Sequence, residues 1–183
     1  MIQTFKNRIQ TSIDLKTSLI NNDIILKTLE TIVHDIVTCY KNDGKVLWAG
    51  NGGSAADAQH LSAELSGRFY YDRPPLFSEA LHVNTSYTTA VANDYSYDII
   101  YSRLTQAMGR KGDVLIGLST SGNSKNVIEA LKVANEIGMV TIGFTGETGG
   151  NMKDVCKHLI NIPSKDTPRI QESHILLGHI VCQ

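Results

Sequence analysis

The first forty residues place hydrophobic side chains at helical spacing. Apolar residues recur in this way over 3–20 and again after Asn21-Asn22-Asp23, a break whose side chains are typical of a helix start. Gly44 predicts the end of the second helix, because glycine readily adopts the conformation that closes helices. The pattern therefore predicts a helical hairpin over residues 1–43.

The pattern changes at residue 45, where short and nearly continuous apolar runs replace the helical spacing. Such runs are typical of strands that are buried on both faces. They occur at 45–50, 113–118, 140–144 and 158–162, with a weaker candidate at 79–83. Helical patterns lie at 54–67, 96–108 and 124–137, and a last helix opens at Thr167-Pro168 with Thr167 as its cap. Alternating strands and helices predict a doubly wound α/β fold, in which helices flank a parallel five-stranded sheet.

Length and composition place the chain among ordinary globular proteins. Its 183 residues predict one domain spanning 1–183, and 42% of them are apolar against 19% charged. The net charge of -1 shows no basic excess, which argues against nucleic acid as a partner. The sequence has neither an apolar run of about 18 residues nor a signal-peptide pattern, so we expect no membrane span. Three well-separated cysteines indicate reduced thiols and a cytoplasmic protein.

A glycine-rich segment after the first predicted strand is a candidate ligand site. Ligands of doubly wound sheets bind beyond the carboxyl ends of the strands, and Gly50-Asn-Gly-Gly-Ser54 lies at such an end. Glycines let backbone amides approach a ligand closely. Ser54 and Asp57 have the spacing of a capping box, which predicts that Ser54 starts the following helix.

A second loop, Ser119-Thr-Ser-Gly-Asn-Ser124, opens the helix predicted at 124–137. It combines four hydroxyls with the free amides of a helix N-terminus and contains no Lys or Arg, which suits a single phosphate monoester. Neither loop matches a Walker sequence or the dinucleotide-binding Gly-x-Gly-x-x-Gly. Each loop alone is also compatible with simple turn chemistry, but two of them at neighbouring strand ends favour a bound ligand.

Two pairs of polar side chains are candidates for catalysis. His60 and Glu64 are four residues apart, so they share one helix face within three turns of the glycine-rich loop. Taken alone, such a pair is usually a surface ion pair. Gln171 and His179 are eight residues apart on the last helix and therefore also face one way. His174 lies on a different side of that largely apolar helix, which predicts a histidine buried in the core.

Two further segments have less specific patterns. Asn93-Asp94 follows an apolar and aromatic stretch and predicts a loop or the end of a helix. Six of the seven tyrosines fall between Tyr70 and Tyr101, which is typical of packing around an irregular segment. The run from Arg68 to Pro75 predicts a surface loop, and its spacing indicates no role.

Four segments together resemble a known family. They are Gly50-Asn-Gly-Gly-Ser-Ala-Ala-Asp-Ala-Gln-His-Leu-Ser-Ala-Glu-Leu65, Ala92-Asn-Asp-Tyr95, Ser119-Thr-Ser-Gly-Asn-Ser124 and Arg169-Ile-Gln-Glu-Ser-His174. Over essentially its whole length the chain resembles the sugar isomerase (SIS) domain family, and within it the phosphoheptose isomerases. The first and last segments are specific to this branch, whereas the Ser-Thr-Ser loop is shared by SIS domains generally.

The resemblance implies a role for each matching residue. The hydroxyl loop is implied to hold a phosphate through Ser119, Thr120, Ser121 and Ser124. The rest of the substrate site is implied to include Asn51, Gly52, Gly53, Ser54, Glu64, Asn93, Asp94 and Gln171. Glu64 and His179 are similar to the acid/base pair of the family. Some members bind zinc, one ion per subunit, through residues that match His60, Glu64, Gln171 and His179, and a set with glutamine and without cysteine predicts an exchangeable ion.

The implied reaction is a ketose–aldose isomerisation. Members convert sedoheptulose 7-phosphate to D-glycero-D-manno-heptose 7-phosphate through an enediol, at the start of bacterial heptose synthesis. A carboxylate and an imidazole can move both protons that this reaction requires. Members are typically homotetramers with active sites between subunits, and the apolar last helix and the hairpin independently predict a homo-oligomer. One departure is Thr167-Pro168, where some members have acidic residues.

Two other functions are compatible with the same fold. One is a non-catalytic SIS-domain scaffold, similar to the tetrameric protein that associates with the bacterial replication initiator. That relative lacks the catalytic carboxylate and histidine, so the presence of Glu64 and His179 favours an enzyme here. The other is a different phosphosugar isomerase, lyase or etherase, against which the set His60, Glu64, Gln171 and His179 argues.

Overall fold

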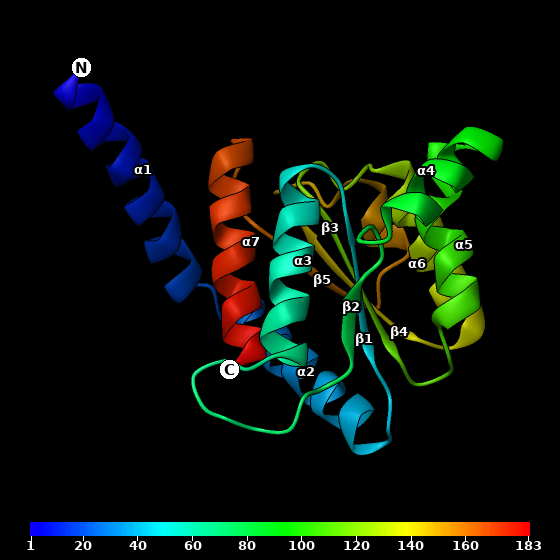
Figure 1. Cartoon of the computed structure of the whole chain (residues 1–183). Coiled ribbons are helices and arrows are strands. Elements are labelled where there is room, and N and C mark those ends of the chain that lie inside the picture. The colour runs from blue at the N-terminus through cyan, green and yellow to red at the C-terminus, as the bar shows by residue number, and fades with distance from the viewer.

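The computed structural model describes residues 1–183 and follows the predicted alternation of helices and strands (Figure 1). In chain order the elements are α1 (Ile2–Ile20), α2 (Asp23–Lys41), β1 (Val46–Gly50), α3 (Gly53–Ser66), β2 (Ser78–Ala80), α4 (Thr85–Asp94), the 3₁₀ turn η1 (Tyr97–Ile99), α5 (Ile100–Met108), β3 (Val114–Ser119), α6 (Lys125–Ile137), β4 (Val140–Thr145), the 3₁₀ turn η2 (Gly150–Asp154), β5 (His158–Asn161) and α7 (Thr167–Cys182).

Five parallel strands form one sheet in the order β2-β1-β3-β4-β5, which confirms the predicted doubly wound fold. β1 and β3 pair in register from Val46 with Val114, and β3 pairs with β4 from Val114 with Val140. Every residue of β1 and β3 is buried, as the continuous apolar runs predicted. Because all strands run the same way, their carboxyl ends lie at one edge of the sheet. The loops that precede α3 and α6 therefore lie next to each other at this edge.

Helices cover both faces of the sheet and enclose two apolar clusters. α2, α3 and α7 lie over one face, and α4, α5 and α6 lie over the other (Figure 1). Successive residues of a strand point to opposite faces, so Trp48 joins the first cluster and Leu47 joins the second. The buried indole of Trp48 donates a hydrogen bond of 2.8 Å to the Ser78 hydroxyl, which satisfies its only polar atom. The face covered by α3 and α7 is the one that carries the candidate catalytic side chains.

Several local predictions need correction. The helix expected over 96–108 is divided into η1 and α5, and α4 precedes it in a stretch for which no helix was predicted. The sequence of α4 is polar and rich in threonine, so its helix depends on the Asn84 side chain, which accepts a hydrogen bond from the amide of Tyr87. α2 ends at Lys41, and Asp43, with φ of 56°, adopts the left-handed conformation expected of Gly44. The cap position of α7 is Asp166, so Thr167 is already helical.

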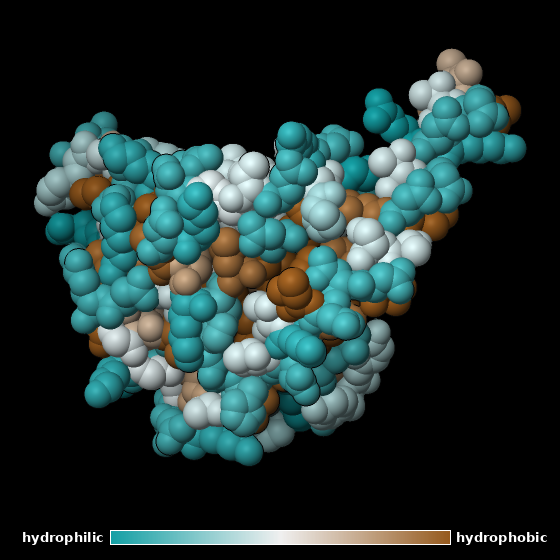
Figure 2. Space-filling view, turned by 180° about the vertical axis from the view of Figure 1, so that it is seen from behind, coloured by the Kyte–Doolittle hydropathy of each residue, from teal (hydrophilic) through white to brown (hydrophobic).

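The N-terminal hairpin leaves an unusually apolar surface. α1 extends away from the body of the molecule (Figure 1). Its side chains Phe5, Ile9 and Ile13 are 57%, 62% and 49% exposed, and they share one helix face. Figure 2 shows apolar residues in a band across the back of the molecule and along the inner side of the projecting helix. None of the helices combines the length and the apolar character needed to cross a bilayer.

A buried ion pair lies at the amino ends of the strands, opposite the loops that precede α3 and α6. Lys45 Nζ lies 2.5 Å from Asp113 Oδ2, and these side chains are only 9% and 3% exposed. The same carboxylate accepts hydrogen bonds from the amides of Lys45 (3.0 Å) and Arg110 (2.8 Å). Asp113 thus joins the start of β1 to the turn before β3, at the amino ends of the strands and opposite the glycine-rich and hydroxyl loops.

Candidate active site

The cap of the helix after the glycine-rich loop lies two residues earlier than predicted, at Gly52 instead of Ser54. Gly52 has φ of 56° and occupies the cap position of α3, so the helix begins at Gly53 and no side chain caps it. Ser54 lies buried inside the first turn, where its amide donates to the carbonyl of Asn51. The predicted capping box of Ser54 and Asp57 is therefore wrong, because the positive φ of Gly52 reverses the chain before Ser54 is reached. Asp57 instead keeps one buried carboxylate oxygen without a hydrogen-bond partner.

Asn51 is held in place by its neighbours at the edge of the sheet. Its side-chain amide exchanges two hydrogen bonds of 2.9 Å with that of Asn126, at the start of α6. The hydroxyl of Tyr97 donates a further bond of 3.0 Å to Asn51 Oδ1. Sequence reasoning missed both Tyr97 and Asn126, since their contacts join segments that are distant in the chain. The network links the glycine-rich loop to the hydroxyl loop.

The hydroxyl loop is arranged as an anion site. The oxygen of Ser119 lies 2.8 Å from that of Ser124 and 3.4 Å from that of Ser121. Ser124 does not cap the following helix α6 with its side chain, and of the first-turn amides that of Val127 donates to Asn126 Oδ1, which leaves those of Lys125 and Asn126 for a ligand. Gly122 has φ of 67°, and a Cβ there would collide with the backbone of Gly149. The tight turn at Gly122 therefore brings the hydroxyls together.

Thr120 and Ser121 open into a cavity of about 320 Å³. Its other walls come from Asn123 of the hydroxyl loop, from the loops that follow β4 and β5 and from the start of α7. They consist of Asn123, Gly146, Glu147, Thr148, Ser164, Lys165, Thr167 and Ile170. Lys165 supplies a cation that the hydroxyl loop itself lacks, although its side chain also pairs with Glu147 at 3.0 Å. These residues were not predicted from the sequence as part of the site. Their position after the carboxyl ends of β4 and β5 could have indicated them, because ligands of doubly wound sheets bind at such ends.

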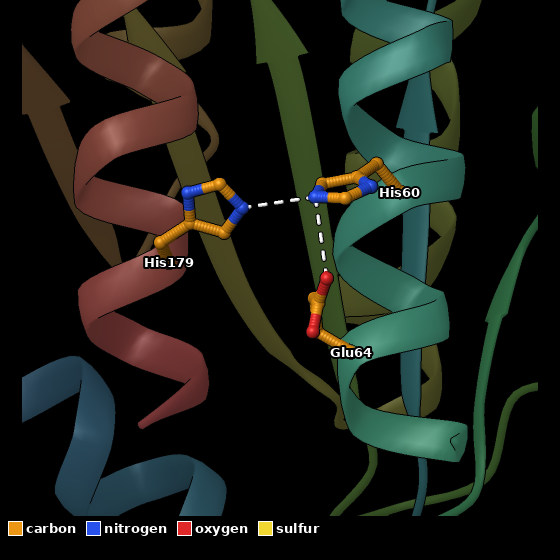
Figure 3. A group of neighbouring side chains, drawn as sticks. All are labelled: His60, Glu64 and His179. Atoms are coloured by element: carbon orange, nitrogen blue, oxygen red, sulfur yellow. Dashed lines mark hydrogen bonds and ion pairs between the residues drawn. The ribbon is translucent and has the colours of Figure 1, made fainter. Parts of the chain in front are cut away.

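Three of the predicted catalytic and metal-binding residues converge between two helices (Figure 3). His60 and Glu64 come from α3 and His179 comes from α7, and each side chain offers one donor atom within 4.8 Å of the others. His60 Nε2 lies 2.9 Å from His179 Nε2 and 3.3 Å from Glu64 Oε1. Gly178 permits this close packing of α7 on α3, because a Cβ there would collide with the side chain of Leu61.

Gln171 lies elsewhere on α7. Its side-chain amide rests against Gly53, where a Cβ would collide with it. Gly53 is seven residues before His60, or about 10 Å along α3. Gln171 also lines a second cavity of about 320 Å³, together with Gly53, Asp57, Pro168, Glu172 and Ile175. The structure thus places Gln171 beside the glycine-rich loop and not in the three-residue cluster.

Burial changes the protonation chemistry of two groups near the site. Desolvation raises the pKa of Asp57, and the charges of His60 and His179 oppose this effect. Desolvation lowers the pKa of His174 to about 4. The hydrogen bond between its Nε2 and the carbonyl of Thr145 acts in the opposite direction and raises the pKa, but its effect is smaller. His174 is completely buried, which confirms the prediction of a core histidine.

Asn93 and Asp94 lie at the end of α4, as predicted. Both side chains are exposed, and the Asn93 amide donates a hydrogen bond of 3.0 Å to the Asp94 carboxylate. Neither residue lines the two cavities described above. The chain nevertheless continues from them to Tyr97, which reaches Asn51, so the segment lies at the same edge of the sheet as the two loops.

Comparison with known proteins gives a consistent result. The SIS domain model matches residues 19–146. The phosphoheptose isomerase of Aneurinibacillus thermoaerophilus is 50% identical over 97% of this chain and 89% of its own, and that of Clostridium acetobutylicum is 49% identical over 96% and 89%.

Solved structures agree with these relatives. The phosphoheptose isomerase of Neisseria gonorrhoeae superposes with a TM-score of 0.92 at 43% identity, covering 100% of this chain and 97% of its own. The one from Francisella tularensis gives 0.94 at 32% identity, covering 99% and 95%. The match therefore includes the N-terminal hairpin and α7 as well as the sheet. The chain belongs to the SIS domain family, within its phosphoheptose isomerase branch.

Proposed function

We propose that this protein isomerises sedoheptulose 7-phosphate to D-glycero-D-manno-heptose 7-phosphate. The observation that carries the proposal is the convergence of Glu64 and His179 from two facing helices, in a chain whose relatives are phosphoheptose isomerases. A binding scaffold needs neither group, whereas an aldose–ketose isomerase needs both a carboxylate and a proton donor. The three cysteines are free thiols, which agrees with the action of the enzyme in the reducing cytoplasm.

Glu64 and His179 divide the proton transfers between them. The carboxylate of Glu64 takes the proton from one carbon and returns it to its neighbour, so that an enediol forms between the two steps. The imidazole of His179 moves the second proton between the two oxygens of the enediol. Because the donor atoms of both groups lie within 4.8 Å, they can serve two adjacent carbons of one substrate. The hydroxyls of the loop between β3 and α6 bind the phosphate of the substrate, at the other end of the sugar from the two reacting carbons.

The cluster also fits a zinc ion. Two imidazole nitrogens and one carboxylate oxygen are the donors that catalytic zinc sites combine with an open position. His60, Glu64 and His179 supply these donors with mutual distances compatible with one ion. Zinc bound there supplies Lewis acidity toward the substrate carbonyl. Gln171, with its amide at Gly53, is a substrate contact in this arrangement and a ligand only after it moves.

The length of α3 indicates that neighbouring subunits share each active site. Glu64 lies eleven residues beyond Gly53, which corresponds to about 16 Å of helix. Gly53 is at the edge of the sheet where the hydroxyl loop also lies, and a seven-carbon sugar phosphate does not span such a distance. One substrate molecule therefore contacts two subunits. Its phosphate binds to the hydroxyl loop of one subunit, and its carbonyl end contacts Glu64 and His179 of a neighbouring subunit. The exposed apolar face of α1 supports a homotetramer in which residues 1–43 make contacts between subunits.

Mixing two inactive variants tests this sharing. Ser121→Asp places a negative charge in the phosphate site, and Glu64→Gln removes the base. Subunits denatured and refolded together are expected to recover about a quarter of the wild-type activity, because a quarter of the shared sites combine two intact halves. Each variant refolded alone serves as the control. Light scattering should give an oligomer at micromolar concentration. A 20.1 kDa monomer, or a mixture as inactive as its components, contradicts the shared site.

Ser121→Ala tests the phosphate site separately. The hydroxyl of Ser121 is exposed to the cavity. The alanine variant loses one hydrogen bond to the charged phosphate, which contributes about 1.5–3 kcal/mol to binding. We expect KM to rise by roughly tenfold or more and kcat to change little, since Glu64 and His179 are untouched. Ser86→Ala, on the exposed surface of α4, is the matched control. Steady-state kinetics that show an unchanged KM for Ser121→Ala place the phosphate elsewhere.

The wild-type assay decides the function itself. Purified protein is incubated with sedoheptulose 7-phosphate, with and without added zinc, and the aldose is detected by NMR. We expect conversion to an equilibrium mixture of ketose and aldose. A protein that leaves the heptulose unchanged under both conditions, while binding a protein partner, supports the scaffold function.

A further inference from the structure

The loop between α3 and β2 reaches the catalytic cluster from below. After α3 it passes beneath the C-terminal end of α7 before it enters β2 (Figure 1). Phe69, near the start of this loop, stacks on the imidazole of His179, with ring centroids 5.5 Å apart and planes 18° from parallel. His60 meets the same imidazole edge-on, with centroids 5.1 Å apart and planes at 81°. The imidazole of His179 is thus bounded by two rings of different orientation.

The loop is anchored on the helix that carries Glu64. Arg73 donates hydrogen bonds of 3.0 Å to the carbonyl of Glu64 and 2.9 Å to that of Leu65. A cation that binds the last carbonyls of a helix is favoured by their unpaired lone pairs and by the helix dipole. A short antiparallel bridge between Phe69 and Tyr71 tightens the loop further. Phe69 is therefore held relative to α3 by contacts that do not involve α7.

Phe69 itself is firmly packed. Its side chain is half-buried and lies against the apolar cluster enclosed by α2, α3 and α7. Tyr70 and Tyr71, the next two residues, are by contrast 74% and 61% exposed. The loop thus turns one of its three consecutive aromatic rings inward, toward His179, and leaves two outside.

We propose that Phe69 is a positioning residue, whose stacked ring fixes the imidazole of His179 so that Nε2 faces His60 Nε2, within the cluster that includes Glu64. The torsion that turns a histidine ring about its Cβ–Cγ bond is broad, so the ring needs a contact from outside to hold one orientation. Aromatic stacking supplies this contact through offset, nearly parallel rings. Residues that orient a catalytic or metal-binding histidine commonly change activity by 10–100-fold when they are removed. The catalytic part of this inference rests on the proposed isomerase function.

Three variants test the proposal. Phe69→Leu keeps an apolar side chain but removes the ring, Phe69→Tyr restores the ring, and Tyr71→Leu makes the same change as the first at an exposed position. We expect Phe69→Leu to lower kcat by about tenfold while KM stays within about twofold, because the phosphate loop is unaffected. Phe69→Tyr and Tyr71→Leu should both keep kcat within about twofold of wild type.

NMR of the histidine rings gives a readout that does not depend on catalysis. Signals are assigned to His179 by comparison with His179→Gln. In Phe69→Leu they should shift and broaden as the ring current is lost and the imidazole reorients, whereas Tyr71→Leu should leave them in place. Circular dichroism and light scattering confirm that each variant is folded and assembled.

The outcomes separate this inference from the proposed function. If wild-type protein converts no heptulose phosphate, the isomerase proposal fails, and the broadening of the His179 signals, which loss of the ring current alone does not cause, decides whether Phe69 positions the ring. Unchanged kcat or unchanged His179 signals in folded Phe69→Leu overturn the inference. An equal fall in kcat in Phe69→Leu and Tyr71→Leu also overturns the inference, because the effect would then come from the loop as a whole and not from the ring of Phe69. If Phe69→Leu does not fold, a tenfold lower kcat in Arg73→Gln with unchanged KM supports the positioning by the anchored loop, and unchanged kcat contradicts it.

Discussion

Glu64→Gln is expected to lower turnover by about 100-fold or more, the usual scale for the loss of a general base. The substitution removes the proton acceptor and the negative charge that pairs with His60, and it keeps the size and shape of the side chain. Glu64 lies in the last turns of α3, far from the cap, and glutamine has nearly the same helix propensity as glutamate. Substrate should still bind, because the hydroxyls between β3 and α6 are intact. We therefore expect a fall in kcat with a nearly unchanged KM, measured in steady-state assays with sedoheptulose 7-phosphate.

His179→Gln should have a similar effect, since it removes the group that shuttles the second proton. Glu129→Gln, on the exposed side of α6, is the matched control and should leave turnover intact. Circular dichroism and light scattering should show wild-type folding and assembly for all three variants. Wild-type turnover in both Glu64→Gln and His179→Gln would make the pair structural and exclude the mechanism given above.

Asp113→Ala is expected to destabilise the folded chain by about 3–5 kcal/mol, although it lies at the opposite end of the strands from the hydroxyl loop. The variant leaves the ammonium of Lys45 buried without its counter-ion, and it removes the acceptor for two backbone amides. The free energy of unfolding is measured by urea titration at a fixed protein concentration, because the oligomer makes stability depend on concentration.

A surface ion pair provides the control for Asp113→Ala. Glu129 pairs with Lys132 at 2.9 Å, and their side chains are 35% and 50% exposed, so Glu129→Ala should cost less than about 1 kcal/mol. Replacing both buried partners together, as Lys45→Met with Asp113→Leu, should recover part of the loss, since it removes the unpaired charge. An Asp113→Ala protein as stable as Glu129→Ala would show that Lys45 finds another partner or reaches solvent.

The central strands β1 and β3 were predictable because they are buried on both faces. Burial on both faces requires continuous apolar runs such as Val46–Gly50, and such runs are visible in one sequence without any partner. α4 was not predictable in the same way. Its turns contain Thr85, Thr88 and Thr89, which favour helix weakly, and its apolar contacts are made with η1 and α5 only after the chain has folded.

The candidate site was also predictable only where its residues are close together in the sequence. Glycines and hydroxyls cluster within single loops, so the local sequence showed both loops, and helix geometry placed His60 beside Glu64. Local sequence could not show the stack of Phe69 on His179 or the pairing of Asn51 with Asn126, because each joins segments far apart in the chain. The error at Ser54 has a local cause, since a glycine with positive φ moves a helix start by one or two residues.

The three free thiols have a consequence for the chemical durability of the protein. Desolvation raises the pKa of Cys39 to about 11 and the pKa values of Cys156 and Cys182 to about 12. Only the thiolate attacks electrophiles or peroxides, and at neutral pH its fraction at these sites is on the order of one part in ten thousand or less. The catalytic groups contain no sulfur. Oxidants that inactivate enzymes through a reactive thiolate therefore find no such thiolate in this chain, and its activity should survive storage without a reducing agent.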